Sequence, residues 1–351
     1  MGVRPLRIVA IGGGTGLSSL LRGLKAFARS PWPGHAAAAP ADSQAVEITA
    51  VVTVTDDGGS SGRLRRQLDI LPPGDIRNCM VALSEDEALL ARLFQYRFTR
   101  GHGLKGHSFG NLFVTALADL TGDFAHAVKL SSEVLAIRGR IFPSTEADVV
   151  LEARLANGKT VEGESRISKS RVPIRRIVLK PRRCPPLVET LEAISAADLI
   201  CIGPGSLYTS VIPNLLVDGI PEAIRRSAAL KCYVVNLMWQ PGETMDYKAS
   251  DHLRALEEHA GTGLVDVALV NTRPIPPALR RRYASGRVFP VAVDLPALER
   301  LGVRVVGRDL LARAEKVRHD PAATASVTVE LALEGRGSLM RRSPVAAAGS
   351  F

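Results

Sequence analysis

The chain of 351 residues lacks any apolar run near the ~18 residues that a membrane helix needs, which excludes a membrane-spanning protein. Its four cysteines form no C-x-x-C pair, so neither a zinc site nor thioredoxin chemistry is indicated, and Cys201 and Cys232 are expected to be inert core thiols. Residues 6–11 read as a short strand followed by glycines and not as a signal peptide, so a cytoplasmic protein is expected. Ser-His-Asp triads and H-E-x-x-H metal motifs are missing too.

Basic charge is the first feature that is present. The net charge is +10, and only nine of the 45 basic residues are lysine, so arginine dominates. Such a balance suits nucleic acid, a membrane surface or small anionic ligands. The dense basic run is limited to Arg280–Arg282, so we expect no nucleic-acid partner. The two remaining interpretations are a solvated basic surface and arginines gathered around a phosphate site.

Strand and helix patterns alternate along most of the chain. With 46% hydrophobic and 23% charged residues, it is not a mostly disordered chain. Continuous apolar runs ended by glycine or polar residues are typical of buried parallel strands, and amphipathic patterns between them predict helices. The strand runs cover 6–11, 48–54, 198–202, 232–237 and 265–270, and the helical patterns cover 17–24, about 75–98, 110–136, 187–196 and 249–260.

Residues 137–185 show a different pattern. Asn157-Gly158 separates two alternating runs, which is the strongest short signal for a β-hairpin. We therefore predict an α/β protein whose mostly parallel sheet is interrupted by a small antiparallel β subdomain. The predicted parts are residues 1–136, 137–185 and 186–330, with a disordered tail at 331–351 and a Pro/Ala-rich surface insertion at 29–46.

Five loops that follow the predicted parallel strands carry glycine and short polar residues. They cover residues 12–16, 55–62, 203–206, 236–243 and 271–273. In an open parallel sheet, ligands bind beyond the carboxyl ends of the strands. These loops are therefore expected to line one ligand site.

The first of these loops, Gly-Gly-Gly-Thr-Gly at residues 12–16, lies between a strand and a helix. Its glycines allow a backbone to approach a ligand closely, and the helix N-terminus suits a phosphate or pyrophosphate. The third glycine position of a dinucleotide fingerprint falls on Leu17, and no Walker lysine follows. A tight turn without a ligand is the alternative interpretation.

The second loop carries two adjacent carboxylates, Asp56 and Asp57, ahead of a Gly/Ser run. Either carboxylate could accept a ribose or sugar hydroxyl or bind Mg²⁺, and either could serve in catalysis. Ser60 and Ser61 would donate hydrogen bonds to a phosphate, and Arg63 or Arg65 could add a charge-assisted hydrogen bond. The alternative is an Asp-rich turn that caps a helix.

Two further motifs open predicted helices. Asp75 is either an N-cap or a catalytic carboxylate, and it places Arg77 and Asn78 in a first helical turn where they could face a ligand. His107 is a candidate general acid–base or phosphate ligand, while a structural cap by Ser108 is the simpler interpretation.

Taken in order, the motifs at 12–16, 55–65, 73–78, 106–111, 203–209 and 240–244 resemble those of the CofD-like family. Within it, the resemblance is to the YvcK-type branch, called gluconeogenesis factors, and it covers residues 6–325. The resemblance implies a Rossmann-like three-layer α/β/α fold. The founding enzyme transfers a 2-phospholactyl group from a nucleotide-activated donor, whereas the YvcK-type branch binds UDP-sugars and is linked to carbon metabolism, cell shape and cell-wall synthesis.

The resemblance also implies a set of site residues. Asp56 or Asp57 matches the acidic strand-end position of the transferase branch, and Asp75 matches its Gly-Asp element. Tyr283 and the Arg318-His319-Asp320 element match positions toward the nucleotide end of the ligand. The full ligand-binding set is Gly12, Gly13, Gly14, Thr15, Gly16, Asp56, Asp57, Ser60, Ser61, Arg63, Arg77, Asn78, Asn111, Gly203, Gly205, Ser206, Asn236, Tyr283 and Arg318.

Three functions are consistent with these residues. A regulator that binds a UDP-sugar such as UDP-N-acetylglucosamine without turnover is favoured over a nucleotide-dependent transferase. An NAD-dependent dehydrogenase is the weakest alternative, because the fingerprint is broken and a His/Arg pair for hydride transfer is not evident. The expected ligands are a UDP-sugar, Mg²⁺ through Asp56 or Asp57, and NAD as an alternative occupant. The expected partners are cell-wall synthesis proteins and a second copy of the chain in a homo-oligomer.

Overall fold

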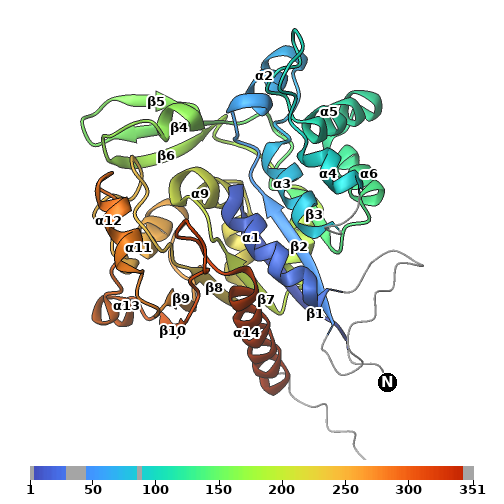
Figure 1. Cartoon of the computed structure of the whole chain (residues 1–351). Helices are drawn as coiled ribbons and strands as arrows, with labels where there is room; N and C mark the ends of the chain where they lie inside the picture. Colours follow the sequence, from blue (N-terminus) through green and yellow to red (C-terminus); the bar gives the residue numbers. More distant parts are fainter. Residues whose placement is uncertain (1–3, 29–44, 85–88, 343–351) are drawn as a thin grey trace, which may run out of the picture.

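A seven-stranded parallel sheet forms the centre of the molecule (Figure 1), seen in a computed structural model that describes residues 4–28, 45–84 and 89–342. The strand order is β10-β9-β8-β7-β1-β2-β3, and a separate antiparallel sheet has the order β5-β4-β6. The predicted α/β fold with an antiparallel insertion is confirmed. The strands are β1 (Leu6–Gly12), β2 (Val46–Val52), β3 (Arg140–Pro143), β4 (Val150–Leu155), β5 (Thr160–Glu162), β6 (Ile174–Lys180), β7 (Leu199–Ile202), β8 (Leu230–Val234), β9 (Val267–Asn271) and β10 (Arg304–Arg308).

Helices cover the parallel sheet, and α1, α3 and α14 lie in front of it in Figure 1. The strand residues between the helical layers are almost wholly buried, which explains why they read as continuous apolar runs. The helices are α1 (Gly14–Leu24), η1 (Lys25–Phe27), α2 (Gly59–Leu68), α3 (Gly74–Leu83), α4 (Leu89–Gln95), α5 (Phe109–Thr121), α6 (Phe124–Val134), α7 (Glu164–Ile167), α8 (Val188–Ser195), η2 (Leu207–Val211), α9 (Ile212–Leu215), α10 (Ile220–Arg226), α11 (Ala249–Ala260), α12 (Pro277–Ala284), α13 (Leu295–Arg300) and α14 (Pro321–Arg342).

The sheet has its topological switch point beside β1. Ala10 of β1 pairs with Ala50 of β2 on one side and with Cys201 of β7 on the other. The chain passes from β1 through α1 to β2, whereas β7 continues in the opposite direction to β8. The loops that leave β1 and β7 therefore diverge, and such a point opens a crevice at the carboxyl edge of the sheet.

The inserted sheet forms where the Asn-Gly signal predicted a hairpin. Ala153 of β4 pairs with Val161 of β5 and with Ile177 of β6, all antiparallel. The turn is closed by the Asn157 side chain, whose Oδ1 accepts a hydrogen bond from the Lys159 N–H at 3.1 Å. The short polar side chain and the glycine thus supply the turn that the two strands need.

The C-terminal prediction is wrong for residues 331–342, which belong to helix α14 instead of a disordered tail. This helix packs along α1 so closely that a Cβ on Gly23 would collide with the backbone of Pro321. Asp198, fully buried, accepts hydrogen bonds from Arg4 Nη2 at 2.7 Å and Arg336 Nη2 at 2.6 Å. An ion pair between residues far apart in the sequence therefore holds α14 against the sheet. No local sequence pattern reveals such a contact. Residues 343–351, and all but the last two of the predicted insertion, lie outside the described residues.

The structure also tests two expectations, one about the cysteines and one about membrane-spanning helices. Cys201 and Cys232 are both buried in adjacent strands, as predicted for core thiols. In the part of the chain that the structure describes, no helix is both long and apolar enough to cross a membrane.

Candidate functional site

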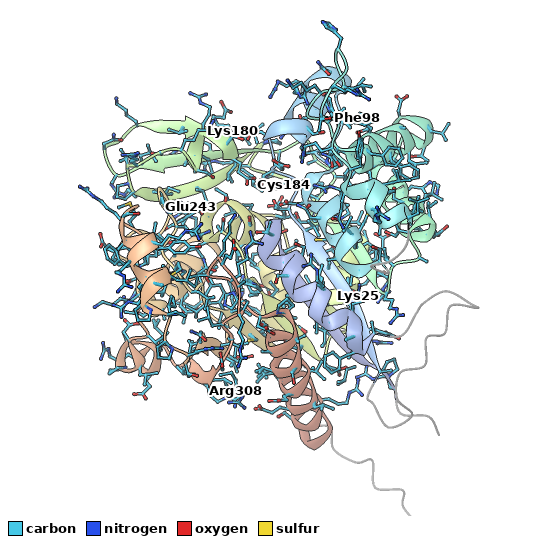
Figure 2. The ribbon with its side chains drawn as sticks, viewed as in Figure 1. Lys25, Phe98, Lys180, Cys184, Glu243 and Arg308 are labelled. Carbon is cyan, nitrogen blue, oxygen red and sulfur yellow. The ribbon has the colours of Figure 1, made fainter. Side chains whose placement is uncertain are left out.

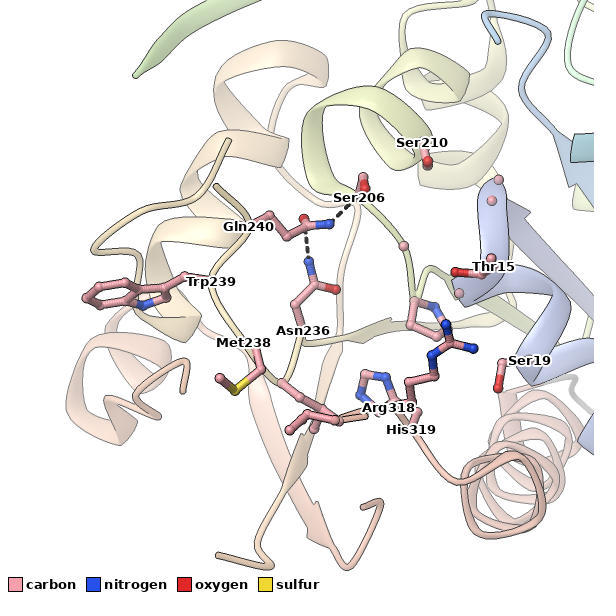
Figure 3. Close-up of a pocket in the computed structure, with 17 residues that line it drawn as sticks. Thr15, Ser19, Ser206, Ser210, Asn236, Met238, Trp239, Gln240, Arg318 and His319 are labelled. Atoms are coloured by element: carbon pink, nitrogen blue, oxygen red, sulfur yellow. Dashed lines mark hydrogen bonds between the residues drawn. The ribbon is translucent and has the colours of Figure 1, made fainter. Parts of the chain in front are cut away.

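A cleft lies at the switch point, where the loops after β1 and β7 diverge (Figure 3). Its volume is about 240 Å³. The β1–α1 turn forms one wall, and the loops after β7 and β8 face it. The lining residues are Gly13, Gly14, Thr15, Gly16, Ser19, Pro204, Gly205, Ser206, Ser210, Asn236, Leu237, Met238, Trp239, Gln240, Val317, Arg318 and His319.

The β1–α1 turn brings backbone close to the cleft, and two of its positions favour glycine for different reasons. Gly14 has φ +63°, a left-handed conformation that favours glycine. A Cβ on Gly16 would collide with the carbonyl group of Pro204. Gly13 is the N-cap of α1 and has no side chain to cap the helix. The turn therefore directs the positive end of the α1 dipole into the cleft, where an anionic group is stabilised.

A network of side-chain amides fixes the opposite wall. Gln240 Nε2 donates to Ser206 Oγ at 2.7 Å, and Asn236 Nδ2 donates to Gln240 Oε1 at 3.0 Å (Figure 3). The same Gln240 oxygen accepts the Leu207 N–H at 3.2 Å. Gln240 is thus held from three sides, so Ser206 and Asn236 have fixed positions facing the glycine turn.

Arg318 supplies the charge of the cleft. Its guanidinium group reaches toward Thr15 and Ser19 at the start of α1 (Figure 3). The neighbouring His319 is half-buried, and its Nε2 lies 3.2 Å from the Val235 carbonyl oxygen. Loss of solvent lowers its pKa to about 4, so it is neutral at pH 7. Of the lining residues that the structure describes, Arg318 alone carries a full charge.

Tyr283, which the resemblance placed near the nucleotide, does not line the cleft. Its hydroxyl accepts a hydrogen bond from the Val317 N–H at 3.2 Å. Its ring packs with Leu237, Met238 and neighbouring apolar residues in a small cluster separate from the main core. Tyr283 therefore holds the segment that carries Arg318.

Asp56 and Asp57, adjacent in the sequence, turn to different partners. Asp56 Oδ1 accepts the Gly58 N–H at 2.9 Å, and its other oxygen lies against Gly74 at the start of α3. Asp57 Oδ1 accepts the Ser165 N–H at 2.8 Å, at the start of α7 in the insertion. Neither lines the cleft of Figure 3. Asp57 therefore ties the inserted subdomain to the parallel sheet, and Asp56 faces α2 and α3.

Asp75 lies directly behind the glycine turn. A Cβ on Gly13 would come within 2.6 Å of Asp75 Oδ2, and the Gly14 N–H donates a hydrogen bond to this carboxyl. Pro73 is the N-cap of α3, so Asp75 lies in the first turn and is not the cap. Burial, and then the charge of Asp56, raise the pKa of Asp75 from 3.8 to about 7.

Two further carboxylates face the same region, and the sequence gave no local signal for the first. Glu164, on α7 of the insertion, has a buried Oε2 with no hydrogen-bond partner among the described residues, and burial raises its pKa well above the usual value. Glu243 lies where the insertion meets the α/β layer (Figure 2), and it accepts the Tyr208 N–H at 3.1 Å. Burial raises the pKa of Glu243 to about 7. Nearby negative charges, Asp75 first among them, raise the Glu164 pKa further.

The carboxylates do not form a metal centre by themselves. Across residues 4–28, 45–84 and 89–342, no group of three or more His, Cys, Asp and Glu side chains is arranged to hold a metal ion. Asp56 and Asp57 accept hydrogen bonds from different segments, so the two carboxylates do not share one site, and Mg²⁺ binding through Asp56 or Asp57 stays a prediction.

Asp56, Asp75, Glu164 and Glu243 are called the acidic group below. A basic group, made of Arg63, Arg77, Arg97 and His107, lies near Asp56 and Asp75. Ser60 Oγ lies 3.0 Å from His107 Nδ1, and Asn111 Nδ2 donates to Ser61 Oγ at 3.3 Å. Ser108 is at the N-cap of α5 as predicted, but its hydroxyl donates to the Phe94 carbonyl and makes no cap hydrogen bond. His107 and the two serines therefore meet, away from the cleft of Figure 3.

Apart from Asp56, Asp57 and Asp75, the predicted residues divide into three groups. Those that line the cleft are Gly13, Gly14, Thr15, Gly16, Gly205, Ser206, Asn236 and Arg318. Those that gather beyond Asp56 and Asp75 are Ser60, Ser61, Arg63, Arg77, His107 and Asn111. Those that support a wall are Gly12, Gly203, Asn78 and Tyr283. Of the lining residues that were not predicted, Ser19 could have been found, because it lies one helical turn after Thr15.

Replacing Asp75 with asparagine is expected to stabilise the protein at high pH. Between pH 3.8 and about 7 the folded chain holds a proton that the unfolded chain has lost, so this carboxyl destabilises the fold progressively as the pH rises through that window. Asp75→Asn removes the effect, so parent and variant should match near pH 4 and differ by ~1–3 kcal/mol at pH 8. Urea unfolding of both proteins measures the difference. The titration of Glu243 contributes to both proteins and therefore drops out of the comparison. A variant that is less stable at pH 8 than the parent would contradict the buried position of Asp75.

The parallel sheet and the glycine-lined cleft at its switch point define a Rossmann-like α/β protein with a cleft at the carboxyl edge of the sheet. Residues 8–311 match the family described as 2-phospho-L-lactate transferase CofD. The chain belongs to this CofD family.

Within the family, the chain is similar to gluconeogenesis factors. It is 47% identical over 335 residues to the gluconeogenesis factor of Bacillus subtilis, covering 95% of this chain and 100% of that protein. It is 49% identical over 330 residues to that of Halalkalibacterium halodurans, covering 94% and 96%. A crystal structure of a Bacillus halodurans protein superposes with a TM-score of 0.86 at 47% identity over 93% of this chain and all of that one. A second crystal structure of the same protein, described as a member of the UPF0052 family, gives a TM-score of 0.85 at 47% identity over 94% of this chain and 99% of that one.

Proposed function

We propose that the chain binds a UDP-sugar such as UDP-N-acetylglucosamine in the switch-point cleft and acts as a ligand-dependent regulator without turnover. The observation that carries the proposal is the glycine turn facing Arg318 across the cleft. Relatives at 47% and 49% identity are named gluconeogenesis factors, which supports a role in regulating carbon metabolism. A role in cell shape and cell-wall synthesis is part of the same proposal.

A diphosphate suits the chemistry of this cleft. The helix N-terminus at Gly14 stabilises one phosphate, and the guanidinium group of Arg318 would form charge-assisted hydrogen bonds to the diphosphate from the opposite wall. Ser206 and Asn236, fixed by Gln240, offer neutral polar atoms for a base or a sugar hydroxyl. Mg²⁺ is not required by this arrangement.

A transferase is the second candidate, and Asp75 favours it. Its carboxyl has a pKa of about 7 and lies against the glycine turn, which is where a general base for an attacking hydroxyl would be needed. Glu243 has a similar pKa nearby. The family description also names a transferase.

Calorimetric titration of the full chain with UDP-N-acetylglucosamine, GTP and NAD, followed by mass spectrometry of the mixtures, separates these functions. The proposal predicts saturable binding of the UDP-sugar, weaker binding of the other two, and unchanged ligand after incubation. Consumption of the UDP-sugar or GTP, lost in Asp75→Asn, would establish the transferase. Preferential binding of NAD would instead support the dehydrogenase alternative.

A further inference from the structure

The N-terminal ends of α2, α3 and α5 meet beside the acidic group, in the upper right part of Figure 1. Asn111 joins them, because its Nδ2 donates to Ser61 Oγ at 3.3 Å and its Oδ1 accepts from Arg77 Nε at 3.2 Å. The N-cap residues of these three helices, all within the described residues, make no side-chain cap hydrogen bond. Three helix dipoles therefore direct their positive ends at one region.

Three guanidinium groups surround this region. Arg63 Nη2 donates to the Lys105 carbonyl at 3.0 Å, and Arg97 Nη1 donates to the Gly106 carbonyl at 2.7 Å. Arg77 donates to an amide oxygen, so all three hydrogen-bond to neutral acceptors. Within the described part of the chain, none of the three forms an ion pair with a carboxylate. Each guanidinium has five N–H donors, so most of them remain for a ligand.

Arg77 has a positively charged neighbour, Arg97, as well as two negatively charged ones, Asp56 and Asp75. Burial lowers the pKa of Arg77, and the positive charge of Arg97 lowers it further. Asp75 and Asp56 oppose this shift from the cleft side. The carboxylates therefore compensate Arg77 in part, while Arg97 on the other side has no such partner among the described residues.

His107 responds to the same charges. It is buried beside Ser60, and its pKa is lowered first by burial and then by Arg63 and Arg97. Both arginines thus lie close enough to repel a positive charge at His107. An anion between these guanidinium groups would remove their mutual repulsion and would accept hydrogen bonds from Arg63, Arg97 and Ser60.

We propose that Arg63, Arg77, Arg97 and His107 form a second anion site, separate from the switch-point cleft, for a compact oxyanion such as a phosphate group. None of these four residues lines the cleft, so one diphosphate at the glycine turn does not occupy both sites. The site would bind the phosphate group of a second, smaller ligand. The inference does not depend on the identity of the nucleotide in the cleft.

Inorganic phosphate is the first probe, titrated into the full chain by calorimetry. Arg63→Gln and Arg97→Gln are each expected to weaken phosphate binding about tenfold, equivalent to about 1.4 kcal/mol. Arg100→Gln, which removes an exposed charge from the same loop as Arg97, is the matched control and should change the affinity less than about twofold. Because Arg97 is exposed, its variant is expected to fold, and circular dichroism checks this.

Glucose 6-phosphate is the second probe and identifies the source of the phosphate. Tighter binding than inorganic phosphate assigns the site to a phosphomonoester, and equal binding assigns it to free phosphate. Equal weakening in the Arg97 and Arg100 variants would show a nonspecific charge effect and overturn the proposal.

A crossed comparison separates this site from the cleft. Gly14→Asp should lose UDP-sugar binding and keep phosphate binding, whereas Arg97→Gln should do the reverse. Loss of phosphate binding in Gly14→Asp with none in Arg97→Gln would place the phosphate at the glycine turn and overturn the second site. Absence of phosphate binding in a parent protein that still binds the UDP-sugar would overturn this inference and leave the proposed function standing.

Discussion

Gly14→Asp is expected to abolish UDP-sugar binding while the protein still folds. Gly14 has φ +63°, and asparagine and aspartate are the side chains that tolerate this region best. A Cβ there would have Ser210 Oγ as its nearest neighbour, at 3.5 Å, so a short side chain has room. The new carboxylate would face the diphosphate, and affinity should fall at least ~100-fold, about 2.8 kcal/mol. Calorimetry against UDP-N-acetylglucosamine measures the loss.

Gly14→Asn is the matched control, because it has nearly the same shape without the charge. It should weaken binding only several-fold, and both variants should lose a similar ~1–2 kcal/mol of stability from the left-handed backbone. Equal affinities for the aspartate and asparagine variants would mean that no phosphate lies at this turn. The glycine turn would then be a tight connection between strand and helix, the simpler interpretation of its sequence.

Asp198→Asn is expected to destabilise the fold by ~3–5 kcal/mol, the cost of leaving a buried charge without its partner. Asp198 is fully buried and accepts hydrogen bonds from Arg4, the Arg7 N–H and Arg336. The Arg336 side chain, 8% exposed, would keep its charge beside a neutral amide. Urea unfolding measures the loss in the free energy of unfolding. It tests whether the packing of α14 against the sheet contributes to the stability of the fold.

The control for this second variant is Glu222→Gln. Glu222 pairs with Arg225 and Arg226 on the surface of α10, where ion pairs contribute at most ~1 kcal/mol. A similarly small loss in Asp198→Asn would show that α14 adds little to stability and that its docking does not depend on the buried ion pair.

The fold was predictable because its signals are local. The buried strands at β1, β2, β7 and β9 read as short apolar runs, and the β4–β5 hairpin is specified by two turn residues, Asn157 and Gly158. Helix α14 was not predicted because it is held by tertiary contacts with residues that are distant in the sequence. It contains two glycines and three arginines, and the contacts that hold it join Arg336 to Asp198, 138 residues away.

The site was predictable only in part, for the same reason. Strand-end loops after β1, β7 and β8 were expected to meet, and eight of the predicted residues do line one cleft. Adjacent positions do not fix side-chain direction, so Asp56 and Asp57 diverge toward partners that the sequence does not reveal. Glu164 reaches the acidic group only because the insertion folds back over the main sheet, and Arg97 joins the basic group through a loop without a motif.

A crystal structure of the full chain with UDP-N-acetylglucosamine tests the central claim most directly. The account predicts an intact ligand whose diphosphate lies against the first turn of α1 at Gly14, with the Arg318 guanidinium on its opposite side. An intact ligand bound elsewhere, or a cleft that stays empty at a ligand concentration that saturates the protein in solution, would contradict it.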